Sequence, residues 1–266
     1  MFMNYISKEI RDADIKAVYK TVNGTDLPIW IYLPKKIRKN ADTVVCIHGG
    51  AWEAMRKETK FDGQTLRWQA DYFSQKGDIG VVISYRSIYV DASIRQLAED
   101  CADAVSYLVN EFDFVNRENI VLMGDSAGAQ LAFILTQKGM LDFVPRAAVL
   151  CNPVSDLIEE KWNMTSKNEK ERTEFSPVCI TDKINTRTSF LLMHGERDTV
   201  VDISDTERLY ELLKEHGKRV RFEALPAARH AFILFNYEED DETVCGYMEK
   251  IEEFLDSTAN ESGSNL

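Results

Sequence analysis

The sequence contains no apolar stretch long enough to cross a bilayer, and residues 1–14 show no cationic start followed by an apolar core. These absences argue against a membrane partner and a secretory signal, so we expect a cytoplasmic protein. Cysteine is also scarce: the chain has five cysteines, an odd number, and none of them are in C-x-x-C spacing. Three of them lie inside apolar runs, which predicts reduced, buried thiols rather than disulfides or a cysteine-based metal site.

Positive charge is in deficit, with 32 Lys and Arg residues against 44 Asp and Glu residues and a net charge of -12. Nucleic acids favour Lys- and Arg-rich surfaces, so this balance argues against a nucleic-acid partner. The apolar share of 44% and the charged share of 29% are ordinary for a globular protein with a sizeable core. Because α/β folds of 266 residues commonly form one unit, and no repeat or linker divides this chain, we expect a single domain over residues 1–266.

Short apolar runs alternate with helical patterns, which is typical of a mostly parallel sheet with helices on both faces. The predicted strands are residues 15–19, 27–33, 43–47, 81–84, 120–123, 147–151, 188–193 and 220–225. The predicted helices are residues 65–76, 93–112, 129–138, 204–216 and 239–255. Asn23 and Gly24 form a hairpin signal, so the sheet should begin antiparallel. Ser204 and Glu207 have the spacing of a capping box at a helix start.

One segment departs from this alternation. Residues 156–187 are rich in polar side chains and longer than a crossover between two strands requires. We interpret them as a crossover that bears a small, mobile cap, with a disordered insertion as the alternative. The chain from residue 257 is small and polar, so we expect a disordered tail over residues 257–266. Residues 53–63 are polar and are expected to form a loop.

The pentapeptide Gly124-Asp125-Ser126-Ala127-Gly128 directly follows an apolar run of strand length and precedes a helical pattern. In this context a serine occupies a tight, strained turn with its hydroxyl exposed, and the flanking glycines allow the strand and helix to pack closely. The pattern predicts that Ser126 is a nucleophile. The pentapeptide alone is a weak signal, so the prediction depends on partner residues elsewhere in the chain.

A serine nucleophile needs an imidazole to take its proton and a carboxylate to orient that imidazole. Functional groups in an open α/β sheet gather after the carboxyl ends of the strands. Asp198 and His230 both follow predicted strands downstream of Ser126, in the expected order. Asp202 and Asp156 are the alternative acids.

The other three histidines have plainer explanations. His216 lies at a helix end, where a cation is favourable. His194 is expected to be a packed turn residue, and His48 is expected to shape the loop that it opens. Backbone N–H groups should hold the oxygen that gains negative charge during reaction. The amide of Ala127 and the amides of Gly49 and Gly50 are the predicted donors of this oxyanion hole.

Together, His48-Gly49-Gly50-Ala51-Trp52, the serine pentapeptide and the late Asp198 and His230 resemble α/β-hydrolase esterases of the hormone-sensitive-lipase-like group. They are also similar to the related bacterial feruloyl and acetyl esterases. The resemblance covers about residues 27–255 and implies an eight-stranded α/β-hydrolase fold, a serine acyl-enzyme mechanism and no cofactor. Ser126, Asp198 and His230 match the triad of that group, and Gly49, Gly50 and Ala127 match its oxyanion donors.

The chain also departs from that group. Its glycine run reads H-G-G-A instead of H-G-G-G, no Ala-Pro-Glu follows Tyr85 and Arg86, and the long N-terminal helical cap of lipase-like members is absent. These differences favour a compact esterase with an open site for short acyl groups, with acetyl or feruloyl esters of carbohydrates suggested by the resemblance. Trp52 and Asp125 are expected to contact the substrate, with Trp162 as a weaker candidate.

Three alternatives stay open. An arylformamidase acting on N-formylkynurenine has similar H-G-G-x-W and G-x-S-A-G-A-Q motifs. A peptidase of the prolyl-oligopeptidase type is ranked lower, because such enzymes read Gly-Gly after the residue that follows the serine and carry a companion domain. A non-catalytic binding protein with this fold has no need of a complete triad. The partner is therefore expected to be a small-molecule ester, and the sequence leaves a homo-oligomer open.

Overall fold

The computed structural model describes residues 10–53, 66–89, 92–235 and 237–263. An eight-stranded sheet lies at its centre, with the strand order β1-β2-β4-β3-β5-β6-β7-β8. The strands are β1 (Ile15–Val22), β2 (Thr25–Tyr32), β3 (Thr43–Ile47), β4 (Ile79–Ile83), β5 (Ile120–Asp125), β6 (Ala147–Cys151), β7 (Ser189–Gly195) and β8 (Arg219–Leu225). β1 and β2 pair antiparallel, as do β2 and β4, and every other neighbouring pair is parallel. The predicted α/β architecture is confirmed.

The antiparallel start comes from the hairpin that joins β1 and β2. Asn23 and Gly24 both have positive φ, 51° and 79°, which is the backbone that a two-residue hairpin turn of the favoured twist requires. Asparagine and glycine are the residues that best tolerate positive φ, so these two residues determine the turn between β1 and β2.

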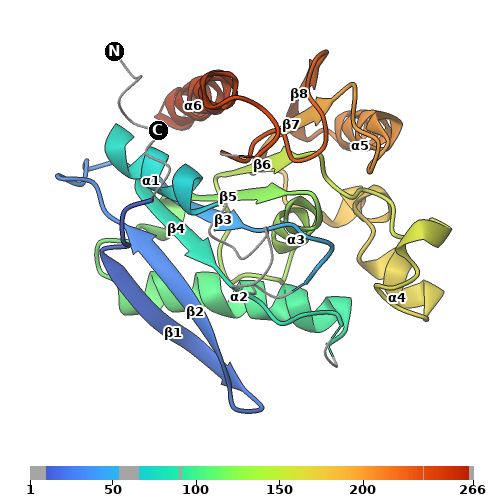
Figure 1. Ribbon diagram of the computed structural model, residues 1–266, viewed down its shortest axis with the longest axis horizontal. Coiled ribbons are helices and arrows are strands. Elements are labelled where there is room, and N and C mark those ends of the chain that lie inside the picture. Colours follow the sequence, from blue (N-terminus) through green and yellow to red (C-terminus); the bar gives the residue numbers. More distant parts are fainter. Residues whose placement is uncertain (1–9, 54–65, 90–91, 236, 264–266) are drawn as a thin grey trace.

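Helices cover both faces of the sheet (Figure 1). α1 (Arg67–Lys76) and α6 (Asp241–Gly263) lie on one face, and α2 (Ile94–Glu111), α3 (Ala127–Leu135) and α5 (Ile203–Glu215) lie on the other. Side chains along β3 point alternately into the two cores: Val44 and Cys46 into the first, Val45 and Ile47 into the second. The central strands are continuous apolar runs because both of their faces are buried.

Several predicted boundaries differ from the structure, and contacts explain three of the differences. α5 begins with Asp202 as its cap, which accepts a hydrogen bond from the Ser204 amide, so Ser204 and Glu207 do not form the expected capping box. α3 ends at Leu135 instead of residue 138, because the Thr136 hydroxyl donates to the Phe133 carbonyl and the chain turns.

The third boundary is the end of α6. The helix continues to Gly263, whereas a disordered tail from residue 257 was expected. Arg146 explains part of this extension, since its guanidinium donates to the Leu255 carbonyl at 3.1 Å and to the Thr258 hydroxyl at 2.7 Å. Those bonds attach the last turns to the rest of the fold. Residues 264–266 lie outside the described chain.

The segment between β6 and β7 is folded into short helices, so the disordered alternative is wrong. These are η2 (Glu160–Trp162), α4 (Glu169–Glu174), η3 (Pro177–Cys179) and η4 (Thr181–Lys183). Trp162 and Phe175, which looked isolated in the sequence, are buried in the core on the α3 side of the sheet. The side-chain amide of Gln130 in α3 donates to the Phe175 carbonyl at 2.8 Å, which attaches this segment to the helix after β5.

The expected loop over residues 53–63 falls outside the described residues from residue 54 onward. All five cysteines are free, and Cys46, Cys101 and Cys151 are buried. Within the described ranges, none of the helices combines the length and apolar character needed to cross a membrane.

Candidate active site

The turn between β5 and α3 holds Ser126 in a strained conformation. Its φ of 52° lies in the left-handed region, which is costly for a residue with a side chain and is found mostly at functional sites. The Ser126 amide donates to the Cys151 carbonyl at 2.9 Å, which anchors the turn to β6. The two flanking glycines are needed for space. A Cβ at Gly124 would lie 2.3 Å from the Gly128 carbonyl oxygen, and one at Gly128 would lie 2.0 Å from the Ile47 carbonyl oxygen.

The structure brings the three predicted triad residues into one hydrogen-bonded chain. His230, in the loop after β8, has its Nε2 3.1 Å from the Ser126 hydroxyl oxygen. The other ring nitrogen of His230, Nδ1, lies 2.7 Å from Oδ2 of Asp198, in the loop after β7. These distances fit an imidazole that accepts the serine proton while donating its own Nδ1 hydrogen to the carboxylate.

Asp198 is held by four donors. Its Oδ1 accepts from the amides of Val200 and Val201 at 2.8 and 3.0 Å. Its Oδ2 faces both His230 and His194, whose Nε2 lies 3.3 Å away. The contact from His194 escaped the sequence analysis, which treated that histidine only as a packed turn residue. The side chain of Asp198 is fully buried, so these donors replace its lost water.

The two alternative acids are engaged elsewhere. Asp202 caps α5 through the Ser204 amide. Asp156 accepts from the Ser176 hydroxyl and forms an ion pair with Arg208 at 3.0 Å. Asp198 is thus the candidate acid that reaches His230.

The electrostatics of the pair favour a charged acid and a basic imidazole. Burial acts to raise the pKa of Asp198, but hydrogen bonds from His194 and His230 outweigh it and lower the pKa below its usual value. For His230, burial acts to lower the pKa, and the hydrogen bond with Asp198 together with the nearby charges of Asp125 and Asp198 raises it above 6.5. Each shift therefore stabilises the ion pair that would form after proton transfer.

The other three histidines hold local structure, and His194 does so in addition to its contact with Asp198. His194 is fully buried, with Nδ1 against the Thr206 hydroxyl at 2.8 Å and Nε2 against the Val201 carbonyl at 3.1 Å. His216 ends α5 with Nδ1 2.9 Å from the Leu212 carbonyl. His48 is buried and stacks on the Tyr85 ring at 4.1 Å.

The loop after β3 passes directly over the serine turn. A Cβ at Gly49 would lie 2.6 Å from the Asp125 carbonyl oxygen and 3.1 Å from the Ser126 Cβ, so only glycine allows this approach. Gly50, Ala51 and Trp52 follow with positive φ values of 81°, 52° and 58°. The Tyr85 hydroxyl donates to the His48 carbonyl at 2.7 Å and so holds the loop's first peptide.

Ala127 is the first residue of α3, so its backbone N–H has no acceptor within the helix. It stands beside Ser126 at the helix N-terminus, where the peptide dipoles favour negative charge. Gly49 and Ala127 therefore lie beside the serine, and Gly50 follows Gly49 in the same loop; the role of these three amides as oxyanion donors stays a prediction.

The two residues expected to contact substrate are both buried. Trp52 is enclosed completely, donates from Nε1 to the Gln130 side-chain oxygen at 3.0 Å, and meets Trp162 edge to face at 5.6 Å. Asp125 lies beneath Ser126 and accepts from the Asn152 amide at 3.1 Å. This burial argues against a pocket wall at Trp52 and a substrate contact at Asp125, so we reassign both to the support of the site. Trp162 belongs to the same packed group.

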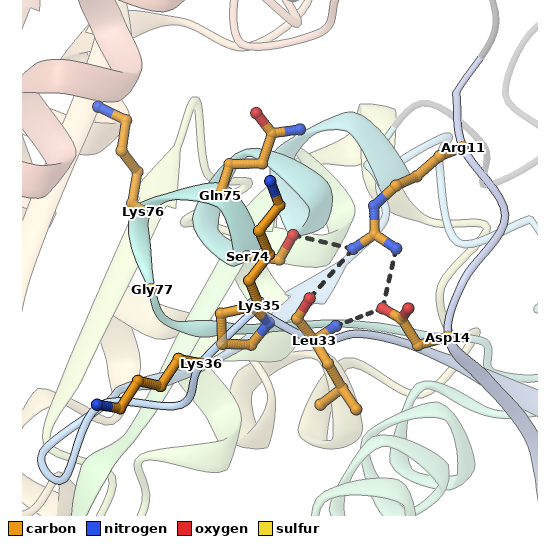
Figure 2. A pocket seen from close by; sticks show the side chains of 10 residues that line it. Arg11, Asp14, Leu33, Lys35, Lys36, Ser74, Gln75, Lys76 and Gly77 are labelled. Atoms are coloured by element: carbon orange, nitrogen blue, oxygen red, sulfur yellow. Dashed lines mark hydrogen bonds and ion pairs between the residues drawn. The ribbon is translucent and has the colours of Figure 1, made fainter.

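A cavity of about 760 Å³ lies away from these residues, where the N-terminal segment meets the ends of β2 and α1 (Figure 2). Its lining includes Arg11, Asp14, Ser74 and Lys76. Arg11 pairs with Asp14 at 2.9 Å and donates to the Ser74 hydroxyl at 3.0 Å. Its guanidinium therefore joins the N-terminal segment to α1. In the described part of the chain, no group of three or more His, Cys, Asp and Glu side chains is arranged to hold a metal ion.

Comparison with known proteins places this site in a family. The model of the prolyl oligopeptidase family matches residues 85–261, which include Ser126, Asp198 and His230. A probable dipeptidyl-peptidase 5 from Aspergillus niger is 22% identical over 248 residues, 83% of this chain. The chain spans only 33% of the length of that relative.

Solved structures similar to this chain include esterase 2 of the planctomycete Thermogutta terrifontis. The propionate-bound form has a TM-score of 0.78 at 23% identity and covers 91% of this chain and 93% of its own. The butyrate-bound form has a TM-score of 0.77 at 24% identity over the same shares of both chains. The apo form has a TM-score of 0.78 at 24% identity and covers 94% and 96%. The predicted α/β-hydrolase fold is confirmed.

The family match also corrects the sequence analysis, which ranked the prolyl-oligopeptidase type low on the residues after the serine and on a missing companion domain. The match over residues 85–261 includes β5 to β8, the serine turn and the loops of Asp198 and His230, so family membership holds despite the local difference at Ala129. The narrower hormone-sensitive-lipase-like or feruloyl esterase subgroup stays a prediction.

Proposed function

The chain belongs to the prolyl oligopeptidase family, and from this premise we propose that it is a serine hydrolase that cleaves carboxylic esters with short acyl groups. The observation that carries the proposal is the continuous contact from Ser126 through His230 to Asp198, at 3.1 and 2.7 Å.

The geometry supports an acyl-enzyme mechanism. The Ser126 hydroxyl attacks the ester carbonyl while His230 Nε2 takes its proton, and the same nitrogen then donates that proton to the leaving alcohol. Water then attacks the acyl carbon and gives a proton to His230 Nε2; the bond between the acyl carbon and Ser126 Oγ breaks, the acid leaves, and His230 returns the proton to Ser126. Asp198 keeps the Nδ1 hydrogen in place and stabilises the imidazolium. The amides of Gly49, Gly50 and Ala127 hold the tetrahedral oxyanion, a contribution of about 3 kcal/mol per donor in comparable enzymes.

Two observations support short acyl groups. The Thermogutta terrifontis esterase, which has similar length and the same fold, was solved with propionate and with butyrate. The sequence also departs from the lipase-like pattern after Tyr85 and Arg86. Acetyl and feruloyl esters of carbohydrates are the natural substrates that the sequence resemblance suggests.

A peptidase is the second candidate, and the family match is the observation that favours it. Ester and amide hydrolysis use the same triad and differ in the leaving group, which must be protonated more completely when it is an amine. The chain covers only a third of the length of the dipeptidyl-peptidase relative. Peptidase activity is therefore something to be tested in this chain and is not assumed.

The deciding experiment compares p-nitrophenyl esters from acetyl to decanoyl with dipeptidyl p-nitroanilides and N-formylkynurenine. We expect turnover of the acetyl to butyryl esters and a loss on the order of 10⁶ in kcat for Ser126→Ala. Ser204→Ala, which removes an exposed serine at the start of α5, is the matched control and should keep full activity. Faster turnover of the anilides would establish the peptidase instead, faster N-formylkynurenine turnover would establish a formamidase, and no turnover of any ester would refute the esterase.

A further inference from the structure

The residue that follows β6 joins the two halves of the candidate site. The side-chain amide of Asn152 donates from Nδ2 to the Asp125 carboxylate at 3.1 Å, and its Oδ1 accepts from the Ala231 amide at 3.2 Å. Asp125 directly precedes Ser126, and Ala231 directly follows His230. One buried side chain thus connects the neighbour of the nucleophile to the neighbour of the base.

Asn152 is itself fixed from several directions. It is fully buried, and its own amide donates to the Met193 carbonyl at 2.8 Å, which links it to β7. The preceding residue, Cys151, accepts the Ser126 amide at 2.9 Å. Neither end of the bridge can therefore move without disturbing the carboxyl ends of the central strands.

Three residues on or next to this connection carry backbone strain. Ser126, Asn152 and Ala231 have φ values of 52°, 38° and 59°, in the left-handed region that residues with side chains rarely occupy. Such conformations persist only where the surrounding contacts over-determine them, and they cluster at sites that need preorganisation. The Asn152 side chain supplies a contact that both strained turns share.

We propose that Asn152 is a positioning residue that sets the placement of Ser126 Oγ relative to His230 Nε2 by binding Asp125 and Ala231 at once. The proposal rests on the proposed function, since it concerns the same nucleophile and base. An amide suits the role because it offers one donor and one acceptor on the same rigid group. Aspartate of the same shape keeps the acceptor and loses the donor, and alanine loses both.

The surroundings of Asp125 make the aspartate variant informative. Burial raises the pKa of Asp125 to about 6, against the influence of His230 and of the Asn152 amide. Other titratable groups that interact with this carboxyl are Asp198, Tyr85, Cys151 and Tyr237. In Asn152→Asp two buried carboxyls would face each other, share one proton at low pH and repel each other once both are ionised.

The test measures kcat and KM on the best ester, and the rate at which a fluorophosphonate labels Ser126. We expect Asn152→Ala to lower kcat and the labelling rate on the order of 100-fold, the effect of a misplaced catalytic group, with little change in KM. For Asn152→Asp, the ratio of its kcat to that of the wild type should fall as pH rises. The double variant Asp125→Asn with Asn152→Asp exchanges the two side chains and restores one donor and one acceptor between them. It should therefore recover most of the lost kcat and labelling rate.

Asn119→Ala is the matched control, because Asn119 donates to the Ala41 carbonyl at 3.3 Å beside the opposite end of β5. It should affect stability and leave kcat unchanged. Wild-type kcat in Asn152→Ala, or a pH-independent ratio in Asn152→Asp without recovery in the exchange variant, would overturn the positioning role while the esterase proposal stands. A wild type whose Ser126 is never labelled would overturn both.

Discussion

The two ends of the parallel strands differ in how the chain is held. At the carboxyl ends, non-glycine residues with left-handed backbone follow four strands: Ala51 and Trp52 after β3, Ser126 after β5, Asn152 after β6 and Ala231 after β8. Elsewhere in the described chain, the one other such residue is Asn23 in the hairpin turn. The strained residues thus gather at the edge that holds the candidate site.

The amino ends of the same strands are held by ion pairs, without such strained residues among those that the structure describes. Asp42, just before β3, pairs with Arg146, just before β6, and the Arg146 Nε lies 2.9 Å from Asp42 Oδ1. Arg146 also reaches α6, and Arg38 pairs with Asp78 at 2.7 Å. Ion pairs also occur at the carboxyl ends, as between Arg86 after β4 and Asp100 at 2.6 Å, so what distinguishes that edge is its strained backbone, which positions the reactive groups.

The largest effect should come from the acid of the strained edge. Asp198→Asn keeps the shape of the side chain but cannot hold the His230 tautomer, so kcat should fall by roughly 10⁴ while the fold remains intact. Steady-state kinetics on a short-chain ester measure this. Near-normal activity would show that another residue is the acid, and would contradict the assignment of Asp198 to the triad.

The ion pair at the opposite edge should show the reverse pattern. Arg146→Met leaves Asp42 largely buried without its partner and frees the end of α6, so the free energy of unfolding should drop by about 3 kcal/mol. Denaturant titration gives that value, and kcat per folded molecule should be unchanged. A large loss of kcat in the folded variant would show that the two edges are not separable.

A smaller effect is expected at Asp202, which lies near the site but caps a helix. Asp202→Ala should lower stability by about 1 kcal/mol, the usual cost of an N-cap, and should leave kcat intact. Thermal unfolding together with the ester assay checks both parts. Loss of activity without loss of stability would return Asp202 to the list of acids.

The smallest effect is a displacement of the pH profile. His230 must be unprotonated to act as a base, and its pKa is raised, so kcat/KM should fall with decreasing pH at a midpoint above 6.5. Asp125→Asn removes a negative charge that contributes to this rise, so its midpoint should lie at lower pH. A profile of Asp125→Asn identical to the wild type would contradict this electrostatic assignment.

Stability should respond to pH in two windows. Because the folded pKa of His230 is raised, its contribution is fully present below 6.5 and is lost as pH rises through the folded value. Because the folded pKa of Asp198 is lowered, its contribution is present above 3.8 and is lost as pH falls toward the folded value.

The strands and the three residues of the contact chain were predictable because short-range patterns determine them. Ser126, Asp198 and His230 each lie within a few residues of a strand end, and parallel strands bring those ends to one edge. The burial of Trp52 was not predictable, because it depends on Gln130 and Trp162, which only the fold brings to it.

The same limit applies to the bridge at Asn152 and to the contact of His194 with Asp198. Each joins loops that follow different strands, and nothing in the local sequence around Asn152 marks its side chain as shared between two turns. The start of α5 shows a competition between signals: Asp202 and Ser204 are both good caps, and the helix begins at the earlier one.

The most direct test of the account is the site of covalent labelling by a fluorophosphonate, identified by intact mass and peptide mapping. A strained serine activated by His230 should take up one equivalent per chain, on Ser126, with no adduct in Ser126→Ala and normal labelling in Ser204→Ala. An unlabelled wild type, or an adduct on a different serine, would contradict the claim that the carboxyl edge of this sheet is built around a reactive Ser126.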